Sequence, residues 1–258
     1  HQTHSQPHQR QHTRRDDADR EHAGHPGLEI GSPPGHAQHG CDEQSAFGGI
    51  VAFNRPLDGE TAAGLGAIFL ECVAAPDFAA EVEPVLKSKK NLRLVRLTSS
   101  DLAGGDGWDL RLLGPWALLQ KESSGPPPQW RGVTRRSATP AELAGLRFAW
   151  EVSAAARSNA IALARGEALI GLGAGQTSRV DAVEVALMKA RRAGHDVRGA
   201  VLASDGFFPF ADSVTRAAEA GVSAIVQPGG SMRDAEVVEE ADRHGVAMMV
   251  TGRRTFRH

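Results

Sequence analysis

The chain has 258 residues, which is enough for one large domain or two domains of ordinary size. Its hydrophobic content of 41% and charged content of 23% are usual for a soluble globular protein, and its net charge of −2 includes no basic excess that would favour nucleic acid. It has no apolar run near the ~20 residues needed to span a bilayer and no apolar signal-peptide core, so we predict a cytoplasmic protein without a membrane partner. Two cysteines, Cys41 and Cys72, are too few for a disulfide framework or a cysteine zinc site.

Residues 1–44 differ in composition from the rest of the chain. Leu28 and Ile30 are their only large aliphatic residues, and eight of the eleven histidines of the chain fall here. Such a segment cannot bury enough apolar surface to offset its chain entropy, so we predict disorder. The histidines have no regular ligand spacing, and we expect no metal site.

Residues 45–137 alternate short apolar runs with helical patterns. A Gly- and Pro-rich stretch occupies residues 98–137, and we expect a subdomain boundary near its end. The predicted elements are a buried strand over Ser45–Phe53, a helix over Ala62–Phe69, a strand over Leu70–Ala75, a helix over Phe78–Lys89, a half-exposed strand over Asn91–Leu97 and a hairpin within Leu110–Leu119.

Residues 138–258 have the clearest pattern, with helices that begin at capping residues and end at glycines. Thr139-Pro140-Ala141-Glu142 predicts a helix start with a capping box, for a helix that runs to about Ala155. Two paired strands, Ala160–Ala164 and Ala168–Leu172, should follow. Three helices are then expected from Ser178 to Gly194, from Asp212 to Gly221 and from Ser231 to Gly245, each followed by a strand: Ala200–Ala203, Ser223–Val226 and Val246–Val250. This order predicts an α/β fold with parallel strands and crossover helices.

Two loops follow these strands, at the edge of a parallel sheet where ligands usually bind. Ser204–Phe210 contains adjacent phenylalanines beside a proline, which suit the stacking of a flat ring, although a loop folded back on the core explains them about equally well. Gln227–Ser231 is the second loop.

A glycine-rich loop, Gly171–Arg179, joins a strand to a helix start. Free amide groups and an arginine there could bind an anion, but a tight turn with an ordinary capping serine is an equally good explanation. The loop is neither a Walker loop nor a dinucleotide fingerprint. The terminal residues 253–258 could be a frayed tail, unless Phe256 docks on the core.

Several colinear segments together resemble the C-terminal, AICAR transformylase half of the bifunctional purine-biosynthesis enzymes. The resemblance covers residues 42–258. Its motifs are Ser45–Asn54, Lys89–Arg93, Arg157–Ile161, Gly173–Asp181, Ser204–Phe210, Gln227–Ser231 and Phe256–His258.

The resemblance implies two cytidine-deaminase-like three-layer subdomains, residues 45–137 and 138–258, with a largely parallel sheet in the second. It implies transfer of a formyl group from the co-substrate 10-formyltetrahydrofolate to AICAR, in active sites shared by a homodimer. The deaminase zinc is not expected, because the His-x-Glu and Pro-Cys-x-x-Cys pairs are absent.

The resemblance also implies roles for individual residues. Asn159 would contact the reacting centre, and His258 would lie beside the catalytic base. AICAR would be bound by Phe47, Gly48, Glu71, Lys90, Arg179, Phe207 and Arg254, the last of these at the phosphate. Formylfolate would be bound by Val180, Pro209, Phe210, Asp212 and Ser231.

The resemblance is incomplete at the N-terminal side. The Lys-His-x-Asn-Pro-Cys-Gly motif that contains the family's proton acceptor is absent, as is the cyclohydrolase half. We interpret the chain as an N-terminally truncated fragment, and we hypothesise that residues 1 to about 41 are an out-of-frame translation, which the other two frames of the coding DNA would test. The chain is then an AICAR formyltransferase domain, or a catalytically silent fragment that retains only nucleotide or folate binding.

Overall fold

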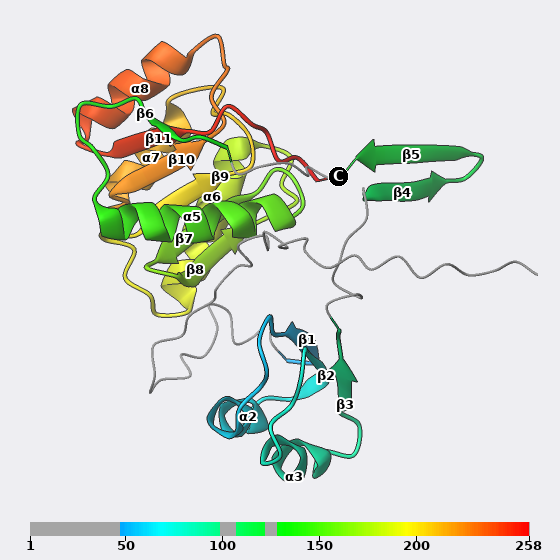
Figure 1. Ribbon diagram of the computed structural model, residues 1–258. Helices are drawn as coiled ribbons and strands as arrows, with labels where there is room; N and C mark the ends of the chain where they lie inside the picture. Colours follow the sequence, from blue (N-terminus) through cyan, green and yellow to red (C-terminus); the bar gives the residue numbers. More distant parts are fainter. Residues whose placement is uncertain (1–46, 99–106, 122–127, 258) are drawn as a thin grey trace, which may run out of the picture.

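The computed structural model describes residues 47–98, 107–121 and 128–257 (Figure 1). The expected disorder of residues 1–44, residue Cys41 and the predicted site residue His258 lie outside these ranges. In the described part of the chain, every helix is too short or too polar to cross a membrane.

The first unit is a three-stranded parallel sheet in the order β1-β2-β3 (Figure 1). Two crossover helices pack on one face of this sheet, where they form a small core around Val73, Val82 and Leu86. The elements are β1 (Gly49–Ala52), α2 (Gly59–Gly66), β2 (Leu70–Ala75), α3 (Val82–Lys87) and β3 (Arg93–Arg96).

The predicted elements of this unit are confirmed, and three details are corrected. The strand β1 is not buried, because the side chain of Ile50 is 74% exposed. The helix α2 begins before Ala62, since the Asp58 carboxylate accepts a hydrogen bond from Thr61 N (2.8 Å) and caps the helix there. The helix α3 is shorter than predicted, because it does not begin until Val82.

The predicted hairpin is confirmed as β4 (Trp108–Leu113) paired with β5 (Trp116–Lys121). The chain reverses at Gly114, whose φ of +61° is accessible to glycine at little cost.

The second unit is a six-stranded sheet in the order β6-β11-β10-β9-β7-β8. Only β9, β10 and β11 are parallel to one another, whereas β6, β7 and β8 pair antiparallel with their neighbours, so the sheet is mixed and not largely parallel. The strands are β6 (Arg131–Gly132), β7 (Ile161–Arg165), β8 (Ala168–Gly173), β9 (Val201–Ser204), β10 (Ala224–Gln227) and β11 (Ala247–Val250). Because β6 pairs with β11, this sheet includes residues that precede the predicted boundary near residue 137.

Helices cover both faces of the second sheet, which gives three layers (Figure 1). On one face, α5 (Pro140–Ala155) buries Leu146 and Trp150 against alternate strand residues such as Val201 and Val226. On the other face, three helices pack over a larger core that includes Leu202, Ile225 and Met248. They are α6 (Arg179–Arg192), α7 (Asp212–Glu219) and α8 (Asp234–Arg243).

The helix ends confirm some predicted caps and correct others. The hydroxyl of Ser178 caps α6 by accepting a hydrogen bond from Asp181 N (3.1 Å). Asp212 is instead the first helical residue of α7, and Ala211 occupies the cap position. Ser231 does not cap α8. The Asp234 carboxylate instead accepts hydrogen bonds from the backbone amides of Gly230 (2.6 Å) and Ser231 (3.1 Å), and α8 begins at Asp234. The predicted C-terminal glycines Gly194, Gly221 and Gly245 all have positive φ, as a left-handed helix end requires.

The contact between β8 and α6 requires glycine. A side chain at Gly173 would overlap the carbonyl of Ala182, and the backbone on both sides is fixed by regular structure. We therefore expect Gly173→Ala to lower the free energy of unfolding by about 1–3 kcal/mol, as overpacking does. Gly132→Ala is the matched control, since its added methyl group would meet only Met249 Sδ at 3.7 Å. Urea unfolding followed by circular dichroism measures both, and an equal effect of the two substitutions would contradict the close packing.

The capping box of α5 makes stability depend on pH. Burial alone would raise the pKa of Glu142, but hydrogen bonds from the Arg136 guanidinium (2.5 Å), from Thr139 N (2.8 Å) and from the Ser223 hydroxyl hold it lower, at about 2 instead of 4.5. A carboxylate with a lowered pKa in the folded state stabilises the fold fully above its unfolded pKa, and this contribution is lost as pH falls from about 4.5 towards 2.

We expect Glu142→Gln to be less stable than the wild type at pH 7, with a difference that shrinks as pH falls through that window. Urea unfolding at a series of pH values measures it. A difference that stays constant between pH 7 and pH 3 would show that Glu142 does not titrate as described.

Candidate functional site

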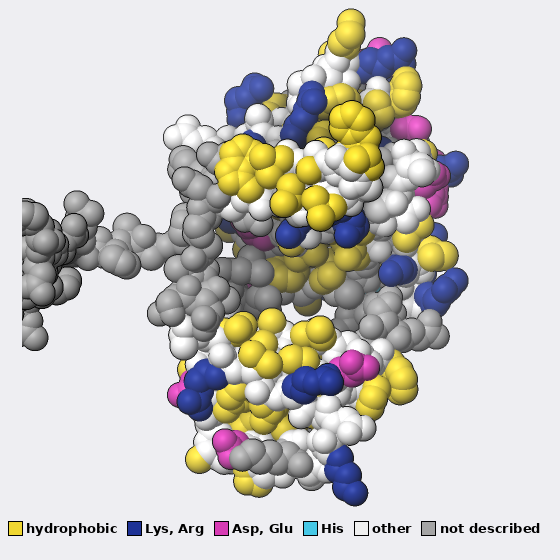
Figure 2. Space-filling model, turned by 90° about the vertical axis from the view of Figure 1, so that its right-hand side faces the viewer, with side chains coloured by type: hydrophobic (Ala, Val, Ile, Leu, Met, Phe, Trp, Pro, Cys, Tyr) yellow, Lys and Arg dark blue, Asp and Glu magenta, His cyan; other side chains and the backbone are white. Residues whose placement is uncertain are grey.

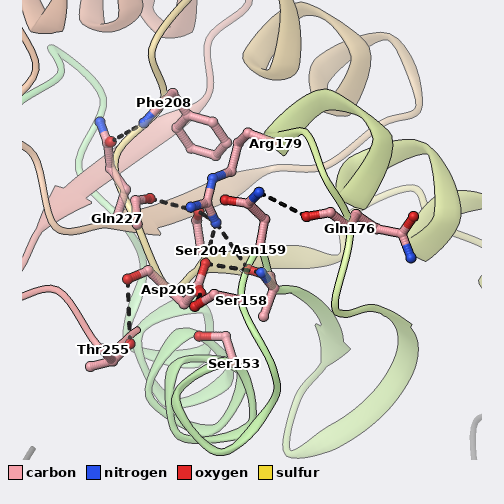
Figure 3. Close-up of polar contacts among 12 residues, drawn as sticks. Ser153, Ser158, Asn159, Gln176, Arg179, Ser204, Asp205, Phe208, Gln227 and Thr255 are labelled. Carbon is pink, nitrogen blue, oxygen red and sulfur yellow. Dashed lines mark hydrogen bonds and ion pairs between the residues drawn. The ribbon is translucent and has the colours of Figure 1, made fainter. Parts of the chain in front are cut away.

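The polar centre of the second unit is a buried ion pair at the carboxyl end of β9 (Figure 3). Asp205 directly follows β9 and its side chain is fully buried, while Arg179 is the first residue of α6 and its side chain is 6% exposed. Arg179 Nη1 donates to Asp205 Oδ1, and Ser204 Oγ lies 3.1 Å from the same nitrogen. The ion pair thereby joins the start of helix α6 to the end of strand β9.

Asp205 also binds two other segments of the chain. Its Oδ1 accepts a hydrogen bond from Ala160 N (3.0 Å), and its Oδ2 accepts one from the hydroxyl of Ser158. Its backbone carbonyl accepts one from Thr255 N (3.0 Å). We call Ser158, Arg179, Ser204, Asp205 and Thr255 the Asp205 cluster.

Asn159 lies beside this cluster on the turn before β7. Its side-chain amide donates to the carbonyl of Gln176 (2.8 Å), and two backbone hydrogen bonds join the same pair of residues. Among the described residues, no donor to Asn159 Oδ1 is recorded, and the residue is only half-buried. The carboxamide is therefore held by its nitrogen, and its oxygen can accept a hydrogen bond from a ligand.

Aromatic rings and arginines border the cluster. The guanidinium of Arg254 lies 4.6 Å from the ring centroid of Phe207, and that of Arg179 lies 6.0 Å from the ring of Phe256. Gly206 lies between them, and a methyl group there would overlap both the Arg179 guanidinium and the Phe256 ring. Only glycine fits at this position. Its lack of a side chain allows the Phe256 ring and the Arg179 guanidinium to approach each other.

The C-terminal tail is docked onto the cluster, as the presence of Phe256 suggested. Thr255 pairs with Asp205, Arg257 N donates to Ser158 Oγ (3.2 Å), and Ser158 N donates to the carbonyl of Arg257 (3.0 Å). Gln120 of the hairpin also donates to the Phe256 carbonyl (2.5 Å). These contacts fix the backbone that presents Arg254.

Arg179 belongs to the Asp205 cluster, and four other predicted site residues, Asn159, Val180, Phe207 and Arg254, lie within two residues of a member along the chain. Phe208, by contrast, is buried in the core, and its N–H donates to Gln227 Oε1 (3.0 Å). Folding back on the core therefore explains Phe208, whereas the stacking of a flat ring on Phe207 stays a prediction.

The predicted folate residues lie around the starts of α6, α7 and α8. Phe210 is half exposed, with the Arg233 guanidinium 4.9 Å from its ring centroid, and the hydroxyl of Ser231 accepts a hydrogen bond from Arg233 N (3.2 Å). Val180 and Pro209 are half-buried, and Asp212 is exposed.

The remaining predicted residues, Phe47, Gly48, Glu71 and Lys90, lie in the first unit. Phe47 is 74% exposed, and its ring centroid lies 5.0 Å from that of Phe69 with the rings tilted by 39°, while Gly48 N donates to the Phe69 carbonyl (2.8 Å). Within the described ranges, no hydrogen bond, ion pair or ring contact joins these four residues to the Asp205 cluster.

A cavity of about 700 Å³ lies beside this site, between α8, β6 and the ends of β10 and β11. The Gln227–Gly230 loop forms part of its wall, but none of the predicted site side chains lines it. In the described part of the chain, no group of three or more His, Cys, Asp or Glu residues could hold a metal ion.

Sequence reasoning did not give a role to Asp205, Ser158 or Thr255. The sequence did indicate a structural role for Asp205. A carboxylate that directly follows a buried strand, here Val201–Ser204, needs a buried partner. Its partner, Arg179, was predicted only as a ligand residue.

The comparisons with known proteins agree with the motifs. The family model described as "AICARFT/IMPCHase bienzyme" matches residues 36–189. The chain belongs to the AICARFT/IMPCHase bienzyme family. The match begins at residue 36, so it reaches further towards the N-terminus than the motifs, which start near residue 42, had indicated.

Two relatives show how much of the family protein this chain represents. The bifunctional purine biosynthesis protein PurH of Chloroflexus aurantiacus is 48% identical over 224 residues, which cover 86% of this chain and 44% of the relative. PurH of Myxococcus xanthus is 47% identical over 222 residues, which cover 84% and 43%. The chain therefore spans less than half the length of these relatives.

Among solved structures, a diaminohydroxyphosphoribosylaminopyrimidine deaminase/5-amino-6-(5-phosphoribosylamino)uracil reductase from Thermotoga maritima aligns with 42% of this chain and 36% of its own. The sequence identity is 20% and the TM-score 0.30, which is too low to establish a shared fold.

The Asp205 cluster should dominate the stability of the second unit. Asp205→Asn preserves the shape but leaves the buried Arg179 guanidinium without a counter-charge, so we expect the free energy of unfolding to fall by about 3–5 kcal/mol. The control is Asp196→Asn, which removes an exposed ion pair with Arg198 and should leave stability nearly unchanged. Urea unfolding compares them, and an Asp205→Asn protein as stable as the control would exclude the anchoring role of the ion pair.

Proposed function

We propose that this chain forms the C-terminal part of an AICAR formyltransferase site. The reaction would transfer a formyl group from 10-formyltetrahydrofolate to the 5-amino group of AICAR, giving FAICAR and tetrahydrofolate in purine biosynthesis. The observation that most supports this is the Asp205 cluster, because it contains Arg179, and because Asn159, Phe207 and Arg254 lie within two residues of a member along the chain. Family membership supports the same reaction.

The chemistry of this reaction explains the kinds of residues required. The AICAR amine is a weak nucleophile, because its lone pair is delocalised into the imidazole ring. Catalysis must therefore orient the amine, remove its proton and stabilise the oxyanion that develops on the formyl carbon. In our proposal the free Oδ1 of Asn159 accepts a hydrogen bond from the amine and so fixes its direction of attack.

The rings and cations beside the cluster suit the rest of the nucleotide. Arg254 would bind the phosphate, since a guanidinium offers paired donors to phosphate oxygens. The ring of Phe207 would hold this guanidinium in place by a cation–π contact. Arg179 would serve the base and its carboxamide. Formylfolate would lie along Val180, Pro209, Phe210, Asp212 and Ser231.

The four predicted residues in the first unit require an explanation in this proposal. We propose a homodimer with shared active sites, in which the first unit of one subunit contributes Phe47, Gly48, Glu71 and Lys90 to the site of the other. We further propose that both units descend from cytidine-deaminase-like subdomains, and that the protein acts in the cytoplasm.

A catalytically silent fragment is the second candidate, because the chain contains no Lys-His-x-Asn-Pro-Cys-Gly motif. Loss of a general base typically lowers a rate by ~10² to 10⁴. Such a fragment would bind AICAR or folate without turnover.

The phosphate contact gives a specific prediction. We expect Arg254→Ala to weaken AICAR binding about 10- to 100-fold, the usual range for a lost charge-assisted hydrogen bond, and to leave binding of the corresponding nucleoside unchanged. Arg216→Ala, which removes an exposed arginine on α7, is the control. Isothermal titration calorimetry measures the binding of AICAR and of the nucleoside to the unmodified chain, to Arg254→Ala and to Arg216→Ala.

A turnover assay with AICAR and 10-formyltetrahydrofolate then separates the two candidates. Formation of tetrahydrofolate above background supports the enzyme, whereas AICAR binding without turnover supports the silent fragment. Absence of AICAR binding by the unmodified chain contradicts both.

A further inference from the structure

Arg233 places a guanidinium among the predicted folate residues. It is the N-cap residue of α8, and its guanidinium carbon lies 4.9 Å from the ring centroid of Phe210. Its backbone N–H donates to the hydroxyl of Ser231 (3.2 Å). Phe210 and Ser231 are both expected to bind formylfolate, so Arg233 contacts two residues of one predicted site, although sequence reasoning gave it no role.

The start of α8 does not need this cation. The N-terminal end of a helix carries a partial positive charge, so a guanidinium is disfavoured there and a carboxylate is favoured. The side chain of Arg233 makes no capping hydrogen bond, and the amides of Gly230 and Ser231 donate instead to the Asp234 carboxylate. The stability of the helix therefore does not explain why an arginine stands at this position.

The charge of Arg233 is only weakly compensated within the chain. Figure 2 shows Lys and Arg side chains on the surface of both lobes, so exposure alone does not distinguish this residue. Its ion pair with Glu236 is 3.8 Å long, the longest recorded among the described residues, and both side chains are more than half exposed. The exposed ion pairs of Arg96, Arg198 and Arg216 are shorter, between 2.9 and 3.3 Å. Because exposed pairs contribute little even at short distance, Glu236 does not prevent the guanidinium from binding another carboxylate.

The ring of Phe210 holds the guanidinium in an orientation that suits a planar anion. A guanidinium over an aromatic face keeps the N–H groups at its edge available, and these match a carboxylate with two parallel hydrogen bonds. The same loop contains a second pair of this kind, since the Arg254 guanidinium lies 4.6 Å from the ring centroid of Phe207. One loop thus supports two guanidinium groups, each on its own phenylalanine.

We propose that Arg233 binds a carboxylate of the glutamate tail of formylfolate. The inference rests on the proposed formyl transfer, and it adds the residue that distinguishes a folate from its analogue without glutamate. The two ligands of that reaction each bring one anionic end, the phosphate of AICAR and the glutamate of the folate. Arg254 is assigned to the phosphate. The pterin is uncharged at neutral pH, so the glutamate is the part of the co-substrate that a guanidinium beside Phe210 and Ser231 recognises.

The test compares tetrahydrofolate with tetrahydropteroate, which lacks only the glutamate, by isothermal titration calorimetry with the 258-residue chain. We expect Arg233→Gln to weaken tetrahydrofolate binding about tenfold, the low end for a hydrogen bond between charged groups because the side chain is exposed, and to leave tetrahydropteroate binding unchanged. Arg233→Lys, which keeps the charge without the paired donors, should restore part of the affinity. The control is Arg243→Gln, an exposed arginine at the other end of α8, which should bind both ligands as the unmodified chain does. Circular dichroism should show that all three variants fold normally.

Several outcomes overturn the inference. An equal loss of affinity for both ligands in Arg233→Gln would show that the guanidinium only holds the Phe210 ring in place. Unchanged binding of both would show that it contacts neither. A separate titration that finds weaker AICAR binding, with tetrahydrofolate binding unchanged, would assign the guanidinium to the nucleotide. These results leave the proposed formyl transfer standing, whereas absence of tetrahydrofolate binding by the unmodified chain would contradict the folate part of that function and the inference with it.

Discussion

The second unit depends on the buried ion pair between Arg179 and Asp205. A charge without water requires a partner and further hydrogen bonds, and Asp205 obtains them from Arg179, Ala160 and Ser158. These partners belong to a helix start, a strand start and the turn before it. The ion pair thus fixes the relative positions of three chain segments at the end of β9, and the tail joins them through Thr255.

The same hydrogen bonds hold two groups of the candidate site in place. Asn159 is held through its amide nitrogen, and Arg254 is held by a backbone that hydrogen bonds to Asp205 and Ser158. Groups fixed in this way lose little entropy when a ligand binds, which is the advantage of a preorganised site. Gly206 contributes by its lack of a side chain, since it allows Phe256 and Arg179 to approach.

The two units differ in how completely they are built. In the second unit, α5 covers one face of the sheet while α6, α7 and α8 cover the other. In the first unit only one face has helices, and Ile50 remains exposed on the other. Among the described residues, the second unit therefore has helices on both faces of its sheet and the first unit has helices on one face only.

The sequence by itself determined the element order, the helix ends at Gly194, Gly221 and Gly245, and the family, because periodicity, left-handed glycines and long motifs are local signals. It also predicted the start of α5, where the capping box lies within four residues. It could not determine the starts of α7 and α8, since the N-cap residues there, Ala211 and Arg233, make no side-chain capping hydrogen bond. Only the tertiary structure decided that the sheet is mixed, that β1 has an exposed side and that Asp205 joins distant segments, because strand pairing and burial depend on residues far apart in the chain.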